Sequence, residues 1–141
     1  MKVLLWLDDT RNPFLDKEQK LPEFTGIIEW VRNYDEFKEW FLYNPLPDVV
    51  SFDHDLADEH YTPEFFWNDY ELSKEFQEWK QKSYVHKTGF DCAKWLANYC
   101  KVEKSKLPDF HVHSANPVGR DNILKLLSKY KSTDNLHSYN H

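Results

Sequence analysis

The chain has 141 residues, of which 40% are hydrophobic and 17% aromatic, and its formal net charge is −6 at pH 7. This composition excludes a disordered chain and fits one globular domain over residues 1–141. The net negative charge argues against binding of duplex nucleic acid through a broad basic surface. No segment approaches the about 20 apolar residues of a membrane-spanning helix, and the 3 glycines are too few for a glycine-rich phosphate loop.

The first apolar run covers residues 2–7 and stops at Asp8. It is shorter than the apolar region of a secretory signal, which has about 7–15 residues, so we expect a cytoplasmic protein. Such a run is typical of a parallel strand that is buried on both faces. Further strands are predicted at 27–32, 48–52 and 110–113.

Three helices are predicted from capping residues that precede apolar residues at helical spacing. Their N-caps are Asn33, Thr88 and Asn116, side chains that accept a hydrogen bond from the first turn of a helix. The helix after Thr88 contains Cys92 and Cys100. These lie about 12 Å apart along a helix axis, which is too far for a disulfide.

Strands and helices alternate through most of the chain, which favours a parallel sheet with right-handed crossovers. We therefore predict an α/β fold, a flavodoxin- or receiver-like three-layer sandwich with strand order 2-1-3-4 and helices on both faces. Residues 10–25 are predicted to form a loop, 59–86 an aromatic-rich helical insertion, and 132–141 a frayed tail.

Polar residues follow three of the predicted strands. They are Asp8 and Asp9 after the first, Asp53, His54 and Asp55 after the third, and His113, Ser114 and Asn116 after the fourth. Because ligands of open α/β sheets bind at the carboxyl ends of the strands, we expect these side chains to converge. Two like charges about 4 Å apart cost about 4 kcal/mol at an effective dielectric constant of about 20. A Mg²⁺ or Mn²⁺ ion held by Asp8, Asp9 and Asp53 would relieve this repulsion; the alternatives are raised pKa values or acids that point into solvent.

Two histidines are candidates for proton transfer. His54 lies between two aspartates, which favour its protonated form near neutral pH. His113 directly precedes the last predicted helix, and one acidic and one basic histidine suit the cleavage of a phosphodiester. His111, two residues earlier on the strand, is interpreted as a core histidine.

The segment 114–120 (Ser-Ala-Asn-Pro-Val-Gly-Arg) has the features of a phosphate site at a helix start. The candidate phosphate-binding residues are Ser114, Asn116, Gly119 and Arg120. The same residues also make an ordinary capped helix. Arg11 follows the first acidic pair and is a candidate either to neutralise it or to contact the phosphate of a substrate.

Four segments, in this order, resemble the cyclic-phosphate processing receiver-like domains. They are residues 7–13 (LDDTRNP), 51–56 (SFDHDL), 88–96 (TGFDCAKWL) and 113–123 (HSANPVGRDNI). The resemblance covers most of residues 1–130 apart from the insertion. It implies a receiver-like fold and the hydrolysis or sensing of cyclic phosphates on nucleotides or RNA ends.

In ordinary receivers an acidic pair and an aspartate after the third strand bind Mg²⁺, and Asp8, Asp9 and Asp53 match those places. Ser114 matches the hydroxyl after the fourth strand. This chain lacks a fifth strand with its lysine, which weighs against phosphorelay signalling through Asp53. The two added histidines point toward hydrolysis instead.

The sequence thus predicts a metal-assisted phosphodiesterase that acts on a cyclic phosphate of a nucleotide or RNA end. The predicted catalytic residues are His54, His113 and Arg11. The alternative is a non-catalytic receiver-like module that binds or sequesters a cyclic nucleotide or oligonucleotide at the same residues. For 59–86 we weigh a lid that stacks on a nucleobase against a helical cover for the core or a dimer contact.

Overall fold

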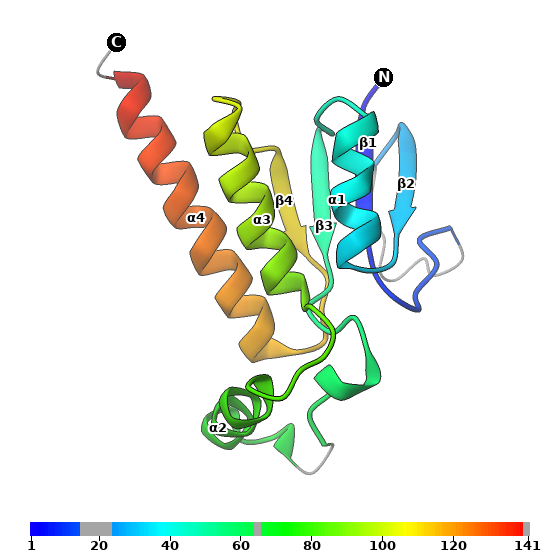
Figure 1. Cartoon of the computed structure of the whole chain (residues 1–141), viewed down its shortest axis with the longest axis vertical. Helices are drawn as coiled ribbons and strands as arrows, with labels where there is room; N and C mark the ends of the chain where they lie inside the picture. Colours follow the sequence, from blue (N-terminus) through cyan, green and yellow to red (C-terminus); the bar gives the residue numbers. More distant parts are fainter. Residues whose placement is uncertain (15–23, 64–65, 140–141) are drawn as a thin grey trace.

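The computed structural model describes residues 1–14, 24–63 and 66–139, and it contains one parallel sheet with helices packed against it (Figure 1). The strands are β1 (Val3–Leu7), β2 (Ile27–Val31), β3 (Val49–Phe52) and β4 (Asp109–Val112). The helices are α1 (Tyr34–Tyr43), α2 (Tyr70–Gln81), α3 (Gly89–Val102) and α4 (Pro117–Tyr139), with a short 3-10 helix, η1, at Asp58–His60.

The strands lie in the order β2-β1-β3-β4, and each neighbouring pair is parallel. This confirms the predicted strand order and the receiver-like α/β fold. The register places Trp6 of β1 opposite Trp30 of β2 and Ser51 of β3. The carboxyl ends of these strands therefore finish at the same edge of the sheet, where the acidic residues follow.

One face of the sheet carries the hydrophobic core. The core joins Leu5, Leu7, Val50 and Phe52 of the sheet to Phe37 and Phe41 of α1, Cys92 and Leu96 of α3, and Ile123 and Leu127 of α4. Because strand residues two positions apart share a face, α1, α3 and α4 all pack on this side. The sequence predicts helices on both faces. The described residues 8–14 and 24–26 of the connection from β1 to β2, which is predicted as a loop, contain no helix that could cover the second face.

The second face of the sheet carries polar contacts around Trp6, whose side chain is fully buried. The indole Nε1 of Trp6 donates to the carbonyl oxygen of Arg11 at 3.0 Å, so the segment after β1 folds back over this face. The ring of His113 stacks on Trp6 with 3.7 Å between ring centroids. This stack holds the end of β4 beside β1 on the side away from the core.

The helices begin where the capping residues predict. Asn33, Thr88 and Asn116 each accept a hydrogen bond through the side chain from the N–H three residues on. Thr88 and Asp91 form a complete capping box, in which Asp91 also accepts from the N–H of Thr88. The local sequence therefore sets the start of each helix that borders the candidate site.

The remaining predictions on the fold have mixed outcomes. Cys92 and Cys100 are free and buried in α3, as expected. The helix α4 continues to Tyr139, so the backbone of 132–139 is helical where the sequence predicts a frayed tail. Much of the predicted loop at 10–25 lies outside the described residues. No helix in the described ranges is long and apolar enough to cross a membrane.

The insertion between β3 and α3 lies beyond the carboxyl ends of the strands, at the lower end of the molecule in Figure 1. His60 holds its two ends together: the Nδ1 atom accepts from the N–H of Leu56 at 2.9 Å, and Nε2 donates to the carbonyl oxygen of His86 at 2.8 Å. The hydroxyl of Tyr70 on α2 donates to Asp121 of α4 at 2.9 Å. The insertion is thus attached to the fold at its ends and at the start of α4.

Candidate functional site

Three aspartates meet where β1 and β3 end. Asp8 and Asp9 follow β1, Asp53 follows β3, and one carboxylate oxygen of each lies within 4.8 Å of the other two. Asp8 is 0% and Asp53 3% exposed. The structure therefore brings together the residues that the sequence predicts as metal ligands, and it buries two of them, while Asp9 is half-buried. We refer to these three residues as the aspartate cluster.

Burial and mutual repulsion change the pKa values in the aspartate cluster. Burial, followed by the charges of Asp8 and Asp55, raises the pKa of Asp53 to about 8. Burial and the charge of Asp8 also raise the pKa of Asp9. Burial acts to raise the pKa of Asp8 as well, but hydrogen bonds from His113 and from two backbone N–H groups outweigh it and lower that pKa. Asp8 therefore keeps its charge, whereas at Asp9 and Asp53 burial and the neighbouring acids outweigh the opposing contributions, among them the charge of Arg11 at Asp53.

The aspartate cluster fits a hard divalent cation. The Oδ1 atom of Asp9 is buried and has no hydrogen-bond partner among the described residues. A buried polar atom without a partner is costly, and a bound cation would satisfy it. Carboxylate oxygens are the ligands that Mg²⁺ and Mn²⁺ prefer. The donor set and the orphaned oxygen together identify these three residues as those that could hold such an ion.

His113 supports the aspartate cluster from the second face of the sheet. Its Nε2 lies 3.0 Å from the Oδ2 of Asp8, and its Nδ1 lies 2.7 Å from the hydroxyl of Ser51. Burial lowers the pKa of His113, although the hydrogen bond and charge of Asp8 act against this. The side chain is 6% exposed and both ring nitrogens are engaged, so the contacts of His113 orient Asp8.

His54 belongs to a separate hydrogen-bond network. Its Nδ1 lies 2.7 Å from the Oδ1 of Asp55, and the side-chain amide of Asn116 donates to the same oxygen at 3.1 Å. The Oδ1 of Asn116 in turn accepts from the N–H of Gly119 at 3.0 Å and from the amide of Gln77 at 2.9 Å. Asn116 is therefore the point where the loop after β3, the start of α4 and the insertion helix α2 are joined.

Two glycines allow α3 and α4 to approach the loop after β3. A Cβ atom at Gly89 would lie 1.9 Å from the carbonyl oxygen of Asp53, and one at Gly119 would lie 2.2 Å from the Cγ of His54. The N–H of Gly89 donates to the carbonyl oxygen of His54 at 2.8 Å. Any side chain at either position would displace the residues of the site.

The predicted phosphate ligands on the segment 114–120 are engaged in local structure or lie apart. The hydroxyl of Ser114 is buried and accepts from the N–H of Asn116 at 3.1 Å. The N–H of Gly119 is occupied by the Asn116 side chain. Arg120 is exposed and lines neither of the two cavities described below. The contacts seen at these residues are those of a well-capped helix.

Arg11 lies beside the aspartate cluster, as predicted. Its Nε is 3.9 Å from the Oδ2 of Asp8, and its Nη1 donates to the carbonyl oxygen of His113 at 3.2 Å. The Arg11 side chain is 27% exposed, in contrast to the fully buried Asp8. A fixed guanidinium group is therefore present at the open side of the aspartate cluster.

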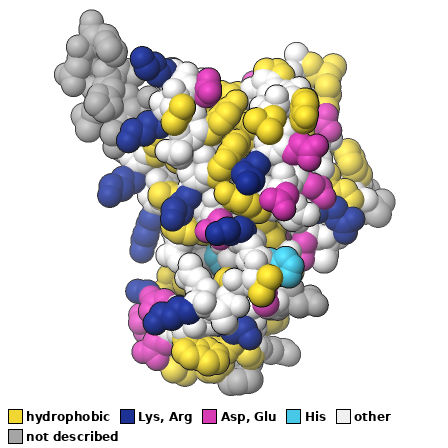
Figure 2. Space-filling view, viewed as in Figure 1, with side chains coloured by type: hydrophobic (Ala, Val, Ile, Leu, Met, Phe, Trp, Pro, Cys, Tyr) yellow, Lys and Arg dark blue, Asp and Glu magenta, His cyan; other side chains and the backbone are white. Residues whose placement is uncertain are grey.

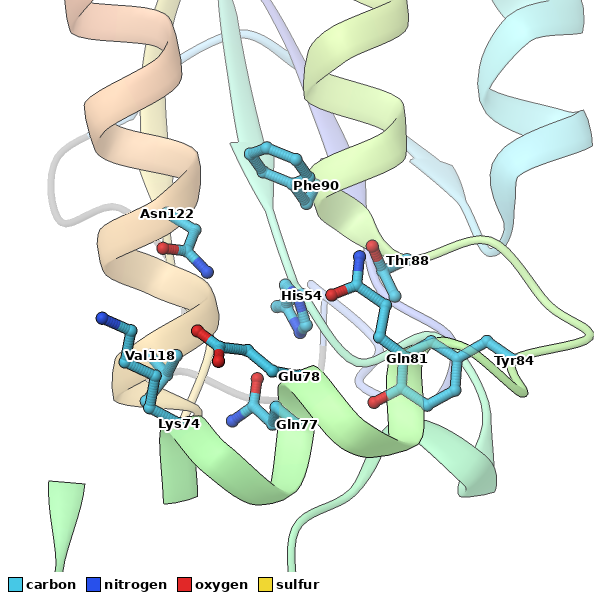
Figure 3. Close-up of a pocket in the computed structure, with 10 residues that line it drawn as sticks. All are labelled: His54, Lys74, Gln77, Glu78, Gln81, Tyr84, Thr88, Phe90, Val118 and Asn122. Carbon is cyan, nitrogen blue, oxygen red and sulfur yellow. The ribbon is translucent and has the colours of Figure 1, made fainter. Parts of the chain in front are cut away.

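Two cavities adjoin these residues. The larger has a volume of about 400 Å³, within the range of about 300–1,000 Å³ typical of small-molecule sites. Its lining residues from the sheet loops and the start of α4 are Arg11, Asp53, Asp55, Ala115, Asn116 and Pro117, and those from the insertion are Tyr61, Thr62, Trp67, Ser73 and Gln77. The smaller cavity has about 90 Å³, lies between α2, α3 and α4, and is lined by His54 (Figure 3). The aspartate cluster and His54 therefore border different cavities, and His113 borders neither.

Two residues of the insertion reach the site and were not predicted. Tyr61 lines the larger cavity, and burial together with the nearby acids raises the pKa of Tyr61. Gln77 is 7% exposed and bonds Asn116. The one sequence signal for Gln77 is its spacing of four from Ser73, which places two small or neutral polar residues on one face of a helix.

The parallel sheet and the acids at its carboxyl edge define a receiver-like α/β domain with a candidate cation site. A family model described as the cyclic-phosphate processing receiver domain matches residues 3–129. The chain belongs to this family, which confirms the resemblance of the four sequence segments. Searches of curated proteins and of solved structures gave no match.

Proposed function

We propose that the protein is a metal-assisted phosphodiesterase that opens a cyclic phosphate on a nucleotide or an RNA end. The observation that carries the proposal is the position of Asp53, which belongs to the aspartate cluster and also lines the 400 Å³ cavity together with Arg11. A candidate cation site and a guanidinium group thus border one space of the size of a ligand pocket. Membership of the family supports a cyclic phosphate as the substrate class.

Asp8, Asp9 and Asp53 would hold Mg²⁺ or Mn²⁺, which when bound polarises a phosphoryl oxygen and lowers the pKa of a coordinated water. The loop that carries two of these ligands is fixed by its own carbonyl groups. The carbonyl oxygen of Asp8 accepts from the indole of Trp30 at 2.8 Å, and that of Asp9 accepts from Arg32 at 2.9 Å. The ligands are therefore held in place before any ion binds.

Arg11 would contact the phosphate. Attack of water on phosphorus breaks one of the two ester bonds of the ring, and negative charge builds on the phosphoryl oxygens and on the leaving oxygen. A guanidinium group held at the cavity wall stabilises this charge through paired N–H donors. The hydrogen bond from Arg11 to the carbonyl oxygen of His113 restricts the side chain and so reduces the ordering that the reaction would require.

The two histidines take different parts in this proposal. Hydrolysis moves one proton from water to the leaving oxygen. We assign this transfer to the pair of Asp55, at the wall of the larger cavity, and His54 behind it, which share a hydrogen bond of 2.7 Å. His113 is assigned a positioning role on Asp8, because both of its ring nitrogens are engaged.

The test is to incubate the purified protein with 2′,3′-cyclic, 3′,5′-cyclic and oligomeric cyclic nucleotides, with and without Mg²⁺ or Mn²⁺, and to identify the products by mass. We expect one ligand class to gain the mass of one water, and we expect EDTA to abolish the reaction. Turnover that persists in EDTA would contradict the metal-assisted reaction. Recovery of every ligand intact would contradict hydrolysis.

The contacts of His113 favour a second candidate, a receiver-like module that binds or sequesters a cyclic nucleotide. A histidine that borders neither cavity leaves only the Asp55–His54 pair for proton transfer. Binding without cleavage requires the cation site, Arg11 and the cavity but no proton transfer. A thermal shift of the protein by a ligand that is recovered unchanged would support this candidate over hydrolysis.

A further inference from the structure

The lining of the larger cavity is of two chemical kinds. The aspartate cluster contributes Asp53, and the insertion contributes the aromatic side chains of Tyr61 and Trp67. Figure 2 shows hydrophobic side chains gathered at the end of the molecule where the insertion lies. The exposed aromatic residues there include Trp67, which is 64% exposed, and Trp79, which is 69% exposed. Of these two tryptophans, Trp67 lines the cavity.

The part of the insertion that borders the cavity is tied to the site by hydrogen bonds. The indole Nε1 of Trp67 donates to the carbonyl oxygen of Thr62 at 2.9 Å, so the exposed ring is held by its own loop. Tyr61 lines the cavity together with Asp53 of the aspartate cluster. Gln77 bonds both Thr62, at 3.3 Å, and Asn116, at 2.9 Å. These contacts hold this part of the insertion in place beside the cavity. We call its lining residues, Tyr61, Thr62, Trp67, Ser73 and Gln77, the insertion wall.

We infer that this wall binds the nucleobase of the substrate and that Trp67 sets the preference for cyclic phosphates that carry a base. The inference rests on the proposed function for the position of the phosphate, at Arg11 and the aspartate cluster. A ring of 64% exposure beside a cavity offers a flat apolar surface, and every nucleobase has a π face that stacks on such a ring.

The polar groups near Trp67 support stacking as the mode of recognition. The carbonyl oxygen of Thr62 accepts from Trp67, and the hydroxyl of Ser73 donates to the carbonyl oxygen of Phe66 at 2.7 Å. Gln77 donates to Thr62 and Asn116. These polar groups form hydrogen bonds within the protein. We therefore expect stacking on Trp67 to bind a base with little selection among bases, as at other aromatic nucleic-acid sites.

The experiment compares Trp67→Ala with two matched variants. Trp67→Phe keeps an aromatic ring, and Trp79→Ala removes a tryptophan of similar exposure on α2 that does not line the cavity. Each protein is titrated with a nucleoside 2′,3′-cyclic phosphate and with the ribose 2,3-cyclic phosphate that lacks the base. The Kd is measured by calorimetry with Mg²⁺ present, or KM is taken where turnover occurs.

We expect Trp67→Ala to weaken the base-containing ligand by about 10-fold, with the Phe variant and Trp79→Ala close to wild type. The base-free ligand should bind all four proteins equally. Equal loss of both ligands in Trp67→Ala, no loss of either, or no binding to wild type would overturn the inference. Base-dependent binding without turnover would contradict hydrolysis and leave base recognition standing. Turnover with equal preference for both ligands would support hydrolysis and contradict base recognition.

Discussion

The aspartate cluster and the insertion wall both depart from the usual distribution of side chains: the first buries acids, and the second exposes an aromatic ring. Asp8 and Asp53 are at most 3% exposed although they are acids, whereas Trp67 is 64% exposed although it is aromatic. Acids are seldom buried unless paired, and large apolar surfaces are seldom displayed without a use. Each region carries an energetic cost that a ligand would relieve: a cation for the acids, and a flat apolar group for the ring.

The two regions also differ in how they are held. The aspartates follow strands, so the parallel sheet fixes their positions through its register. The insertion is attached at a few points instead. His60 and Glu59 close its ends, since Glu59 accepts from the backbone N–H groups of Val85 and His86. Gln77 joins its helix to Asn116. Variants can therefore be chosen that act first on the aspartate cluster, on the start of α4 or on the insertion.

The largest effect is expected from Asp53→Asn, which removes a charge from the aspartate cluster. We expect turnover of a cyclic phosphate to fall by about 100-fold or more, because the cation site loses a ligand. In EDTA the same variant should melt at a higher temperature than wild type. Burial and neighbouring charges raise the pKa of Asp53 to about 8, which means that its ionised form destabilises the fold.

The measurements are product formation with Mg²⁺ and thermal unfolding in EDTA. The control is Asp109→Asn, which changes an aspartate whose side chain is 77% exposed on β4. The control loses only an exposed ion pair with Lys131 at 3.6 Å, so it should leave turnover unchanged and alter the melting temperature little. A lower melting temperature of Asp53→Asn in EDTA would show that repulsion within the cluster does not dominate.

The next largest effect concerns the junction at Gly119. A Cβ at this position would lie 2.2 Å from the Cγ of His54, so Gly119→Ala must displace the imidazole or the start of α4. We expect a loss of about 1–3 kcal/mol in the free energy of unfolding, the usual cost of overpacking. Urea unfolding measures it. The neighbouring Arg120→Ala, at an exposed position, should differ from wild type by less than about 0.5 kcal/mol.

A smaller effect is expected from Gln77→Leu, which separates the insertion from Asn116. The variant keeps the size of the side chain and removes the hydrogen bonds to Asn116 at 2.9 Å and to Thr62 at 3.3 Å, while the Oδ1 of Asn116 still accepts from Gly119. We expect about 1 kcal/mol lower stability and faster amide exchange in α2. Gln81→Leu, at an exposed position of the same helix, is the control. Equal exchange rates in the two variants would mean that Gln77 does not couple the two regions.

The positions of the acids at the strand ends could be predicted from the sequence because the pattern that marks them is local. Apolar runs that end in acids place Asp8 and Asp53, and the strand order then brings them together. The separation of His54 from His113 could not be predicted in this way. Both follow strands, but His113 turns to the Trp6 face and His54 packs against Gly119. Side-chain direction after a strand end depends on tertiary contacts.

In the insertion, the positions of the side chains depend even more strongly on tertiary contacts. Its aromatic residues predict a helical segment beside the site, and α2 is there. Which aromatic residue lines the cavity depends on how the insertion is attached, and those contacts join residues far apart in the sequence. Gln77 and Asn116 are 39 positions apart. No periodicity within the insertion distinguishes Trp67 from Trp79.

The smallest expected effect is a pH dependence at the base of the insertion. Burial lowers the pKa of His60 from the ordinary value of 6.5. The unfolded chain therefore binds a proton more readily than the native protein does. The contribution of neutral His60 to stability is full above pH 6.5 and is lost as the pH falls from that value toward the lowered pKa.

We expect the free energy of unfolding of wild type, measured in urea between about pH 7.5 and 5, to fall more steeply than that of His60→Gln. The variant should also be less stable at pH 7.5, because it disturbs the hydrogen bonds to Leu56 and His86. The control is His111→Gln. His111 on β4 is exposed, so its interpretation as a core histidine is wrong, and the variant should keep the wild-type slope. Parallel pH profiles for wild type and His60→Gln would show that the insertion is not held by a neutral His60.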